Sequence, residues 1–364
     1  MNRNYGIDLL RMILMYMVVV LHILGHGGVL DAAVPMSEQY CAAFLLESLA
    51  YCAVNGYGII TGYVYSGRTP RMASLVQLWL QAEVYSLGIA VCVWLLKPQY
   101  FTLGMLLNQS LPVYREAYWY LSSYVGLFLL IPFLNWYLQY VSEKQARYFV
   151  LLSFVLISVL PTALGGDPFN LQGGYSTAWL VYLYLIGACI RKFEWGKDVS
   201  KARGIWVFLL SAALTWFAKL AMDALTIRIF SERRDYLNPY SYTSPTVILA
   251  AVSLLLVFRN MKLPPKLQTL VAALSPATFG VYLIHEQTYF KGYFIHDRFI
   301  MLADLHPGIM VASVLAIAIG VFVVCIAVDY VRCRFFVWLR VREKLDVLES
   351  CLKNYLTKAK QEGD

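Results

Sequence analysis

Charge is scarce in this chain. Only 14% of its 364 residues are Asp, Glu, Lys or Arg, whereas a soluble domain has about 25%. No polar block separates the apolar runs, which recur from one end of the chain to the other, and the mean hydropathy is +0.59. This composition excludes a series of soluble globular domains. It predicts a helical membrane protein with many spans.

Several motifs of soluble enzymes and metal proteins are also absent. The seven cysteines include no C-x-x-C pair, so neither a metal site nor a disulfide framework is predicted. No G-x-S-x-G stretch occurs, which argues against a nucleophilic serine on a strained turn. There is no inverted repeat of the kind that many secondary transporters contain. The first apolar run lacks a small-x-small cleavage site, so we expect a retained span rather than a signal peptide.

The long apolar runs predict an all-α polytopic domain of about ten spans over residues 1–330. A basic amphipathic tail is expected over residues 331–364. A helix needs about 20 apolar residues to cross roughly 30 Å of hydrocarbon. The expected spans cover residues 5–28, 40–65, 73–96, 119–140, 146–164, 177–190, 204–224, 244–258, 276–293 and 308–330.

Positive residues in the loops predict the orientation. A cytoplasmic N-terminus places most Lys and Arg residues on that side of the membrane, including Arg68, Arg71, Arg191 and Lys192, as the positive-inside rule requires. An even number of spans then places the C-terminus in the cytoplasm as well. The net charge of +8 is therefore largely topological, and no nucleic-acid partner is predicted. The tail is expected to lie on the anionic inner leaflet of the lipid bilayer.

The first span, residues 5–28, contains polar side chains that need a reason to be in a membrane. Arg11 and His22 are eleven residues apart, which is about 1100° and only ~20° past three full turns, so both face the same way. His26 follows one turn after His22. An ionisable side chain at the bilayer centre costs about 2.5–3.5 kcal/mol on insertion scales. We expect Arg11 and His22 to share one solvent-accessible cavity, unless the Arg11 guanidinium reaches the headgroups instead.

Later spans add further polar groups. Ser275 and Pro276 are typical of a helix N-cap and first helical position, which puts His285 about 14 Å into span nine. A histidine at that depth is either a functional residue or a hydrogen-bonding partner of another helix. Lys219 and Asp223 have i, i+4 spacing and are expected to form a structural ion pair.

A buried histidine and a buried arginine are suited to acyl transfer. Histidine can take a proton from a hydroxyl near physiological pH, and arginine can hold a phosphate or stabilise negative charge. Without a nucleophile motif, the simplest mechanism is direct attack of a hydroxyl on a thioester. One alternative is a proton-coupled secondary transporter that uses His22, Glu83, His285 and Glu286 as a relay. Another is a non-catalytic membrane partner in which the polar residues only hold helices together.

An ordered set of motifs resembles acyltransferase family 3, a family of bacterial inner-membrane O-acyltransferases. Each motif alone is weak, but their order along the chain is that of the family. The matching stretches are GIDLLR (6–11) followed by His22, VNGYGIITGY (54–63), YWY (118–120) with IPFLN (131–135), and TFGVYLIHE (278–286).

The resemblance implies transfer of an acyl group, expected to be acetyl, from acyl-CoA to a hydroxyl of a cell-envelope glycan or a lipid-linked glycan. It implies that Arg11 and His22 are the functional pair, with His22 as general base or acid, and that His285 occupies a family position. No tightly bound cofactor is implied, because acetyl-CoA is a substrate. Trp119, from a matching motif, is predicted to bind substrate. Glu47 is added because spans one and two are expected to be antiparallel neighbours.

Family members often have a basic cluster after span two. Here Arg68 and Arg71 have the R-x-x-R spacing, but Ser74 and Gln77 stand where further Lys or Arg would be expected. Arg68 and Arg71 are therefore either ligands of the CoA phosphates or ordinary positive-inside loop residues.

Overall fold

The computed structural model describes residues 3–96, 102–115, 117–233 and 240–361, and every regular element in these ranges is helical. Eight helical segments are long and apolar enough to cross a membrane. Two shorter helices, α10 (Thr177–Lys192) and α12 (Pro245–Phe258), lie at the expected spans six and eight. The all-α polytopic fold predicted from the apolar runs is confirmed.

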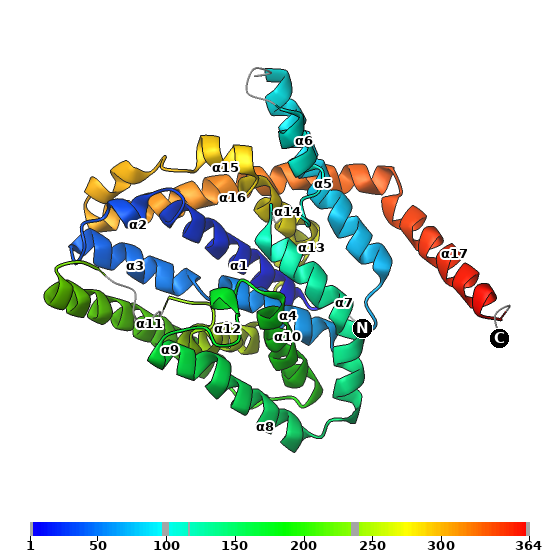
Figure 1. The fold of residues 1–364 in the computed structure, drawn as a ribbon, viewed down its shortest axis with the longest axis horizontal. Coiled ribbons are helices and arrows are strands. Elements are labelled where there is room, and N and C mark those ends of the chain that lie inside the picture. The colour runs from blue at the N-terminus through cyan, green and yellow to red at the C-terminus, as the bar shows by residue number, and fades with distance from the viewer. Residues whose placement is uncertain (1–2, 97–101, 116, 234–239, 362–364) are drawn as a thin grey trace.

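Helix α1 lies in the middle of the bundle, between α3 and α11 on one side and α16 on the other (Figure 1). It contacts α3, α4, α12, α14 and α16. The long segments are α1 (Tyr5–Leu24), α3 and α4 (Glu38–Ala50 and Ala53–Tyr65), α5 (Met72–Leu96), α7 (Trp119–Tyr140), α8 with η2 and α9 (Glu143–Phe154, Val155–Val159 and Leu160–Leu164), α11 (Lys201–Phe230), α13 with η4 and α14 (Pro265–Leu274, Ser275–Ala277 and Thr278–His285), and α16 (Pro307–Trp338). The connections contain α2 (Val29–Ala32), α6 (Leu103–Gln109), η3 (Gln172–Gly174), α15 (Thr288–Phe294) and η5 (Ile300–Asp304), and α17 (Val341–Gln361) follows α16.

Span nine differs from its predicted range of 276–293. It begins at Pro265, which occupies a first helical position, and it ends at His285. Pro276 does not start the helix, so the predicted N-cap there was wrong. The chain passes this proline through a 3-10 segment, because proline lacks an N–H and clashes with the preceding helical turn. His285 is therefore the last residue of its helix rather than a residue near its middle.

Span two is interrupted close to its centre. Helix α3 ends at Ala50 and α4 begins at Ala53. Just after the break, the Asn55 side chain donates to the Tyr242 carbonyl at 2.7 Å and accepts from Trp179 Nε1 at 3.0 Å. These buried hydrogen bonds connect α4, the second half of span two, to α10 and to the segment before α12.

Buried ion pairs connect other helices of the bundle. Lys219 Nζ lies 3.0 Å from Asp223 Oδ1 within α11, and the other oxygen of Asp223 accepts from Tyr40 of α3 at 2.5 Å. The predicted structural role of this pair is confirmed. On α16, Arg332 pairs with Asp329 at 2.7 Å, and two polar side chains of α5 donate to the same carboxylate. Each carboxylate thus ties its own helix to a neighbour.

Helices α4 and α10 approach closely at two glycines. A Cβ on Gly62 would lie 1.9 Å from the Tyr184 carbonyl oxygen, and a Cβ on Gly187 would lie 1.9 Å from the Ile59 carbonyl oxygen. Small residues allow membrane helices to approach this closely. No other side chain fits at either position unless the two backbones separate.

Gly187→Ala is therefore expected to destabilise the protein. The added methyl group can be accommodated only by moving α4 away, and overpacking of this kind costs about 1–3 kcal/mol. Thermal unfolding in detergent should show a lower midpoint than the wild type. Gly320→Ala on α16 is the matched control, because its new Cβ has nothing within 4 Å. Equal midpoints for Gly187→Ala and the wild type would contradict the close packing of α4 on α10.

Candidate active site

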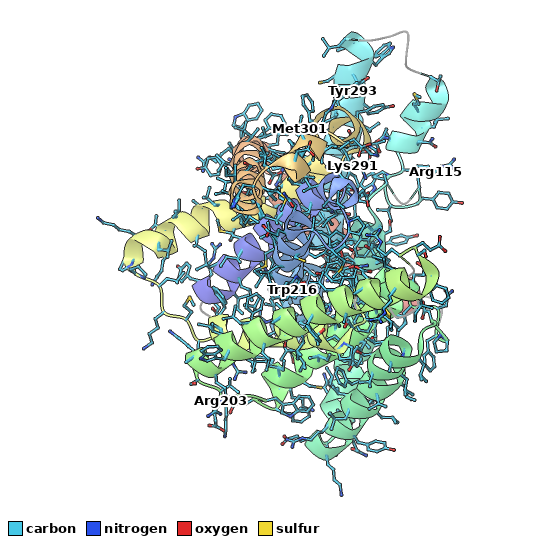
Figure 2. All side chains as sticks on the ribbon, turned by 90° about the vertical axis from the view of Figure 1, so that its left-hand side faces the viewer. Arg115, Arg203, Trp216, Lys291, Tyr293 and Met301 are labelled. Carbon is cyan, nitrogen blue, oxygen red and sulfur yellow. The ribbon has the colours of Figure 1, made fainter. Side chains whose placement is uncertain are left out.

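The ends of α1 and α14 bring two histidines together at the end of the bundle opposite the N-terminus. His22 Nδ1 lies 2.8 Å from His285 Nε2 and 3.0 Å from Glu286 Oε2. His26 Nε2 lies 3.7 Å from the same oxygen of Glu286, and Lys291 of α15 pairs with the other oxygen. Figure 2 looks onto this end of the bundle and labels Lys291. Three segments thus contribute to one polar cluster.

The hydrogen bonds assign the tautomers of the two histidines. His285 Nδ1 lies 2.5 Å from the Val281 carbonyl oxygen, and a carbonyl can only accept, so Nδ1 bears the proton. In a neutral His285, Nε2 then accepts a hydrogen bond from His22 Nδ1–H. This leaves the lone pair of His22 on Nε2. The Glu286 carboxylate beside Nδ1 can stabilise the imidazolium that forms when Nε2 takes a proton. His22 is thus arranged to act as a general base.

His22 lines a cavity of about 420 Å³ whose walls are largely aromatic. The ring centroid of Trp119 lies 4.4 Å from that of Tyr175 and 6.1 Å from that of Tyr242, with the Tyr242 ring stacked at 19°. Glu47 also lines this cavity, and its Oε2 is buried without a hydrogen-bond partner among the described residues. The other aromatic lining residues are Tyr51, Tyr57, Tyr120, Phe279 and Tyr282. We call this space the histidine cavity.

A second cavity, of about 330 Å³, lies near the start of α1. Its lining includes Arg3, Arg11, Arg68 and Arg191, together with the carboxylate of Asp8. Asp8 accepts from Arg3 Nε at 2.6 Å and from Arg11 Nη1 at 3.1 Å. Four guanidinium groups and one carboxylate line this space, and the excess of positive charge attracts polyanions such as phosphates. We call it the arginine cavity.

Arg11 and His22 therefore do not share one cavity, and that prediction was wrong. They lie on one helix about 16 Å apart along its axis, and each lines a different space. Tyr57 lies between them, because its ring lines the histidine cavity and its hydroxyl donates to the Arg11 carbonyl at 2.6 Å. The ring of Tyr120 meets that of Tyr57 edge-on, with centroids 6.2 Å apart.

The other predicted site residues divide between these places. Glu47 and Trp119 line the histidine cavity with His22. His285 is fully buried, does not line the histidine cavity, and contacts the lining residue His22 at 2.8 Å.

The two loop arginines separate from each other. Arg68 lines the arginine cavity with Arg11. Arg71 lines neither cavity, and its Nη2 lies 2.8 Å from Asp346 Oδ1 of α17. Ser74 and Gln77, where further basic residues were expected, both accept hydrogen bonds from Arg342 of α17, at 3.0 and 3.4 Å. The tail thus provides a guanidinium beside these two positions.

Sequence reasoning named Glu286 only as part of the transporter relay and gave Lys291 no role in the site. The predicted span nine, residues 276–293, did not show that both side chains would meet the end of α1. The helix instead ends at His285, and the side chain of Gln287 caps the short helix α15. No strong signal marks this end, since glutamine is not among the preferred N-cap residues.

The histidine cluster also has the spacing of a metal site. One ligand atom from each of His22, His285 and Glu286 lies within 4.8 Å of the others. The ammonium group of Lys291 contacts Glu286, and this positive charge opposes the binding of a cation. We therefore keep the prediction of a metal-free site, in which these groups hold protons.

Comparison with known families agrees with this geometry. The family model described as an acyltransferase domain matches residues 4–330, a range that contains every lining residue of the histidine cavity and all those of the arginine cavity except Arg3. No curated protein and no solved structure matches the chain. The protein is therefore a polytopic membrane protein that belongs to acyltransferase family 3.

Proposed function

We propose that this protein is an O-acyltransferase of the bacterial inner membrane. It moves an acetyl group from acetyl-CoA to a hydroxyl of a cell-envelope glycan or a lipid-linked glycan. The observation that carries this proposal is the pairing of His22 Nδ1 with His285 and Glu286, which leaves Nε2 of His22 free to act as a base toward a hydroxyl. Family membership supports acyl transfer, and the histidine base supports a hydroxyl acceptor.

The donor is proposed to bind from the cytoplasm, at the end of the bundle where α1 begins. Acyl-CoA is polyanionic, and the arginine cavity offers guanidinium groups from Arg3, Arg11, Arg68 and Arg191. The distance of about 16 Å from Arg11 to His22 is comparable to an extended pantetheine arm. For the thioester to reach His22, the rings of Tyr57 and Tyr120 between the cavities must move apart.

The acceptor is proposed to bind in the histidine cavity from the opposite side of the membrane. The faces of Trp119, Tyr175 and Tyr242 offer apolar surfaces against which a sugar ring can pack. Glu47 presents a buried carboxylate oxygen without a partner among the described residues, and such a group needs a donor. A sugar hydroxyl meets that requirement.

The proposed reaction needs one proton transfer in each direction. His22 Nε2 takes the proton of the acceptor hydroxyl while its oxygen attacks the thioester carbonyl. When the tetrahedral intermediate collapses, the C–S bond breaks, an O-acyl ester forms, and the CoA thiolate takes the proton from the His22 imidazolium. Glu286 stabilises that imidazolium in between, and Lys291 can offset negative charge that develops nearby.

A proton-coupled transporter is the second candidate, because one observation favours it. The break between α3 and α4 lies beside Glu47 and Tyr51, which line the histidine cavity, and transporters often bind substrates at such discontinuous helices. Glu83, which belongs to the relay of the transporter alternative, is buried, and neither of its carboxylate oxygens has a hydrogen-bond partner among the described residues. It does not line the histidine cavity.

A labelling experiment separates the candidates. Purified protein in proteoliposomes receives acetyl-CoA labelled in the acetyl group, together with membrane glycan. We expect label in the glycan that mild alkali releases, as it does from an O-ester but not from an amide. Movement of label or glycan across the membrane without covalent labelling would favour the transporter. If the glycan is not labelled and nothing moves across the membrane, the non-catalytic partner would be favoured.

Glu47→Gln is expected to raise the KM for the acceptor about tenfold. Glutamine replaces one carboxyl oxygen by an NH₂ group that cannot accept a hydrogen bond, and a buried polar group left unsatisfied costs about 1–3 kcal/mol. A cost of about 1.4 kcal/mol is a factor of ten. The KM for acetyl-CoA should stay unchanged. Steady-state transfer rates at varied acceptor concentration measure this. Glu38→Gln, an exposed position on the same helix, is the control, and an unchanged acceptor KM for Glu47→Gln would place Glu47 outside the acceptor site.

A further inference from the structure

The tail helix packs against the start of a distant helix of the bundle. The acyltransferase family match ends at residue 330, and α17 follows it. Figure 1 shows α17 continuing from the end of α16 toward the side of the molecule where the N-terminus lies. There α17 contacts α5, which begins at Met72. Nothing in the family match assigns a role to this contact.

Several polar contacts join the two helices. Arg342 Nη1 donates to Ser74 Oγ at 3.0 Å and to Gln77 Oε1 at 3.4 Å. Glu349 Oε2 accepts from the backbone N–H of Ala73 at 3.1 Å. The first N–H groups of a helix have no partner within it, and a carboxylate at this end also interacts favourably with the helix dipole. Glu349 thus caps α5 from a helix far along the chain.

A second carboxylate of α17 holds the residue just before α5. Asp346 Oδ1 lies 2.8 Å from Arg71 Nη2 and 3.2 Å from Arg342 Nε. Lys353 pairs with Glu349 at 2.7 Å. The pKa of Glu349 is lowered, first by its hydrogen bond from Lys353 and then by the backbone N–H that it caps. Both helices therefore meet through complementary charges.

The loop between α4 and α5 is held at its other end as well. Asn135 of α7 donates from Nδ2 to the carbonyl oxygens of Tyr65 and Arg68, each at 2.8 Å. The intervening loop carries Arg68 into the lining of the arginine cavity. Asn135 therefore holds the start of this loop, and α17 holds its end through Arg71.

We propose that α17 is a positioning element of the donor site, because its hold on Arg71 and on the first turn of α5 keeps Arg68 in place to bind the phosphates of acyl-CoA. The identity of this ligand rests on the proposed function. Arg71 acts through the tail in this arrangement and does not itself bind the donor. If α17 served only to anchor the protein to the membrane surface, its release would leave donor affinity unchanged.

The test measures equilibrium binding of CoA to full-length protein in detergent. The double variant Asp346→Asn/Glu349→Gln removes both carboxylates that hold α5, and we expect CoA affinity to fall about tenfold. Tryptic cleavage within α17, at Lys344 and Lys353, should become faster in the same variant, which reports release of the tail independently of any activity. Lys344→Ala, an exposed change on the same helix, should leave CoA affinity as in the wild type.

A charge exchange tests the role of Arg71. Arg71→Asp alone should weaken CoA binding, and Arg71→Asp combined with Asp346→Arg should restore it, because the pair is re-formed with reversed signs. No restoration would overturn the proposal in favour of direct phosphate binding by Arg71. Faster cleavage of α17 with unchanged CoA affinity would overturn it as well. A wild-type protein that binds no CoA would instead contradict the proposed function.

Discussion

His22→Ala should lower the rate of acetyl transfer about 10²–10⁴-fold, the usual contribution of a general base. The lone pair of His22 is on Nε2 because Nδ1–H donates to His285 Nε2, with Glu286 Oε2 3.0 Å from Nδ1, and alanine has no group that can replace this base. The rate constant for transfer of label at saturating acetyl-CoA and acceptor measures this effect. CoA affinity should stay as in the wild type, because His22 does not line the arginine cavity.

Two further histidine variants make this result specific. His285→Ala should cause a smaller loss, since His285 is buried, does not line the cavity, and acts by orienting His22. His296→Ala, at an exposed position, should leave the rate unchanged. Undiminished transfer by His22→Ala would remove this histidine from the reaction, although the family assignment would stand.

Arg11→Ala should raise the KM for acetyl-CoA about 10–100-fold, since a hydrogen bond to a charged group contributes about 1.5–3 kcal/mol. The fold should tolerate this change, because Asp8 keeps its contact with Arg3 at 2.6 Å. Arg11→Lys should recover part of the loss, because lysine keeps the charge but not the planar fork of donors. Transfer rates at varied acetyl-CoA measure the effect.

Arg11→Ala should leave the KM for the acceptor as in the wild type. The reason is that Arg11 lines the arginine cavity and not the histidine cavity, where the acceptor is proposed to bind. Arg203→Ala, an exposed arginine at the start of α11 that Figure 2 labels, is the control. A rise in the acceptor KM with an unchanged donor KM would show that Arg11 belongs to the acceptor site and not to the donor site.

The elements that local pattern specifies were predicted well. Long apolar runs indicated an all-helical membrane protein, because a helix satisfies its own backbone in lipid whatever its neighbours are. The i, i+4 spacing of Lys219 and Asp223 indicated an ion pair that the structure contains. Span nine was misplaced because Pro276, a common first helical residue, here lies inside a continuing span.

By itself the sequence determined the helical membrane architecture and marked Arg11, His22 and His285 as polar groups that need an explanation. Only the tertiary structure decided that His22 meets His285, 263 residues away, that Arg11 lines a separate cavity, and that Arg71 holds the tail. The physical reason is that helical periodicity determines only the direction in which a side chain points from the axis of its own helix. Which neighbour it then meets depends on how distant helices pack, and that packing follows from close contacts such as those at Gly62 and Gly187.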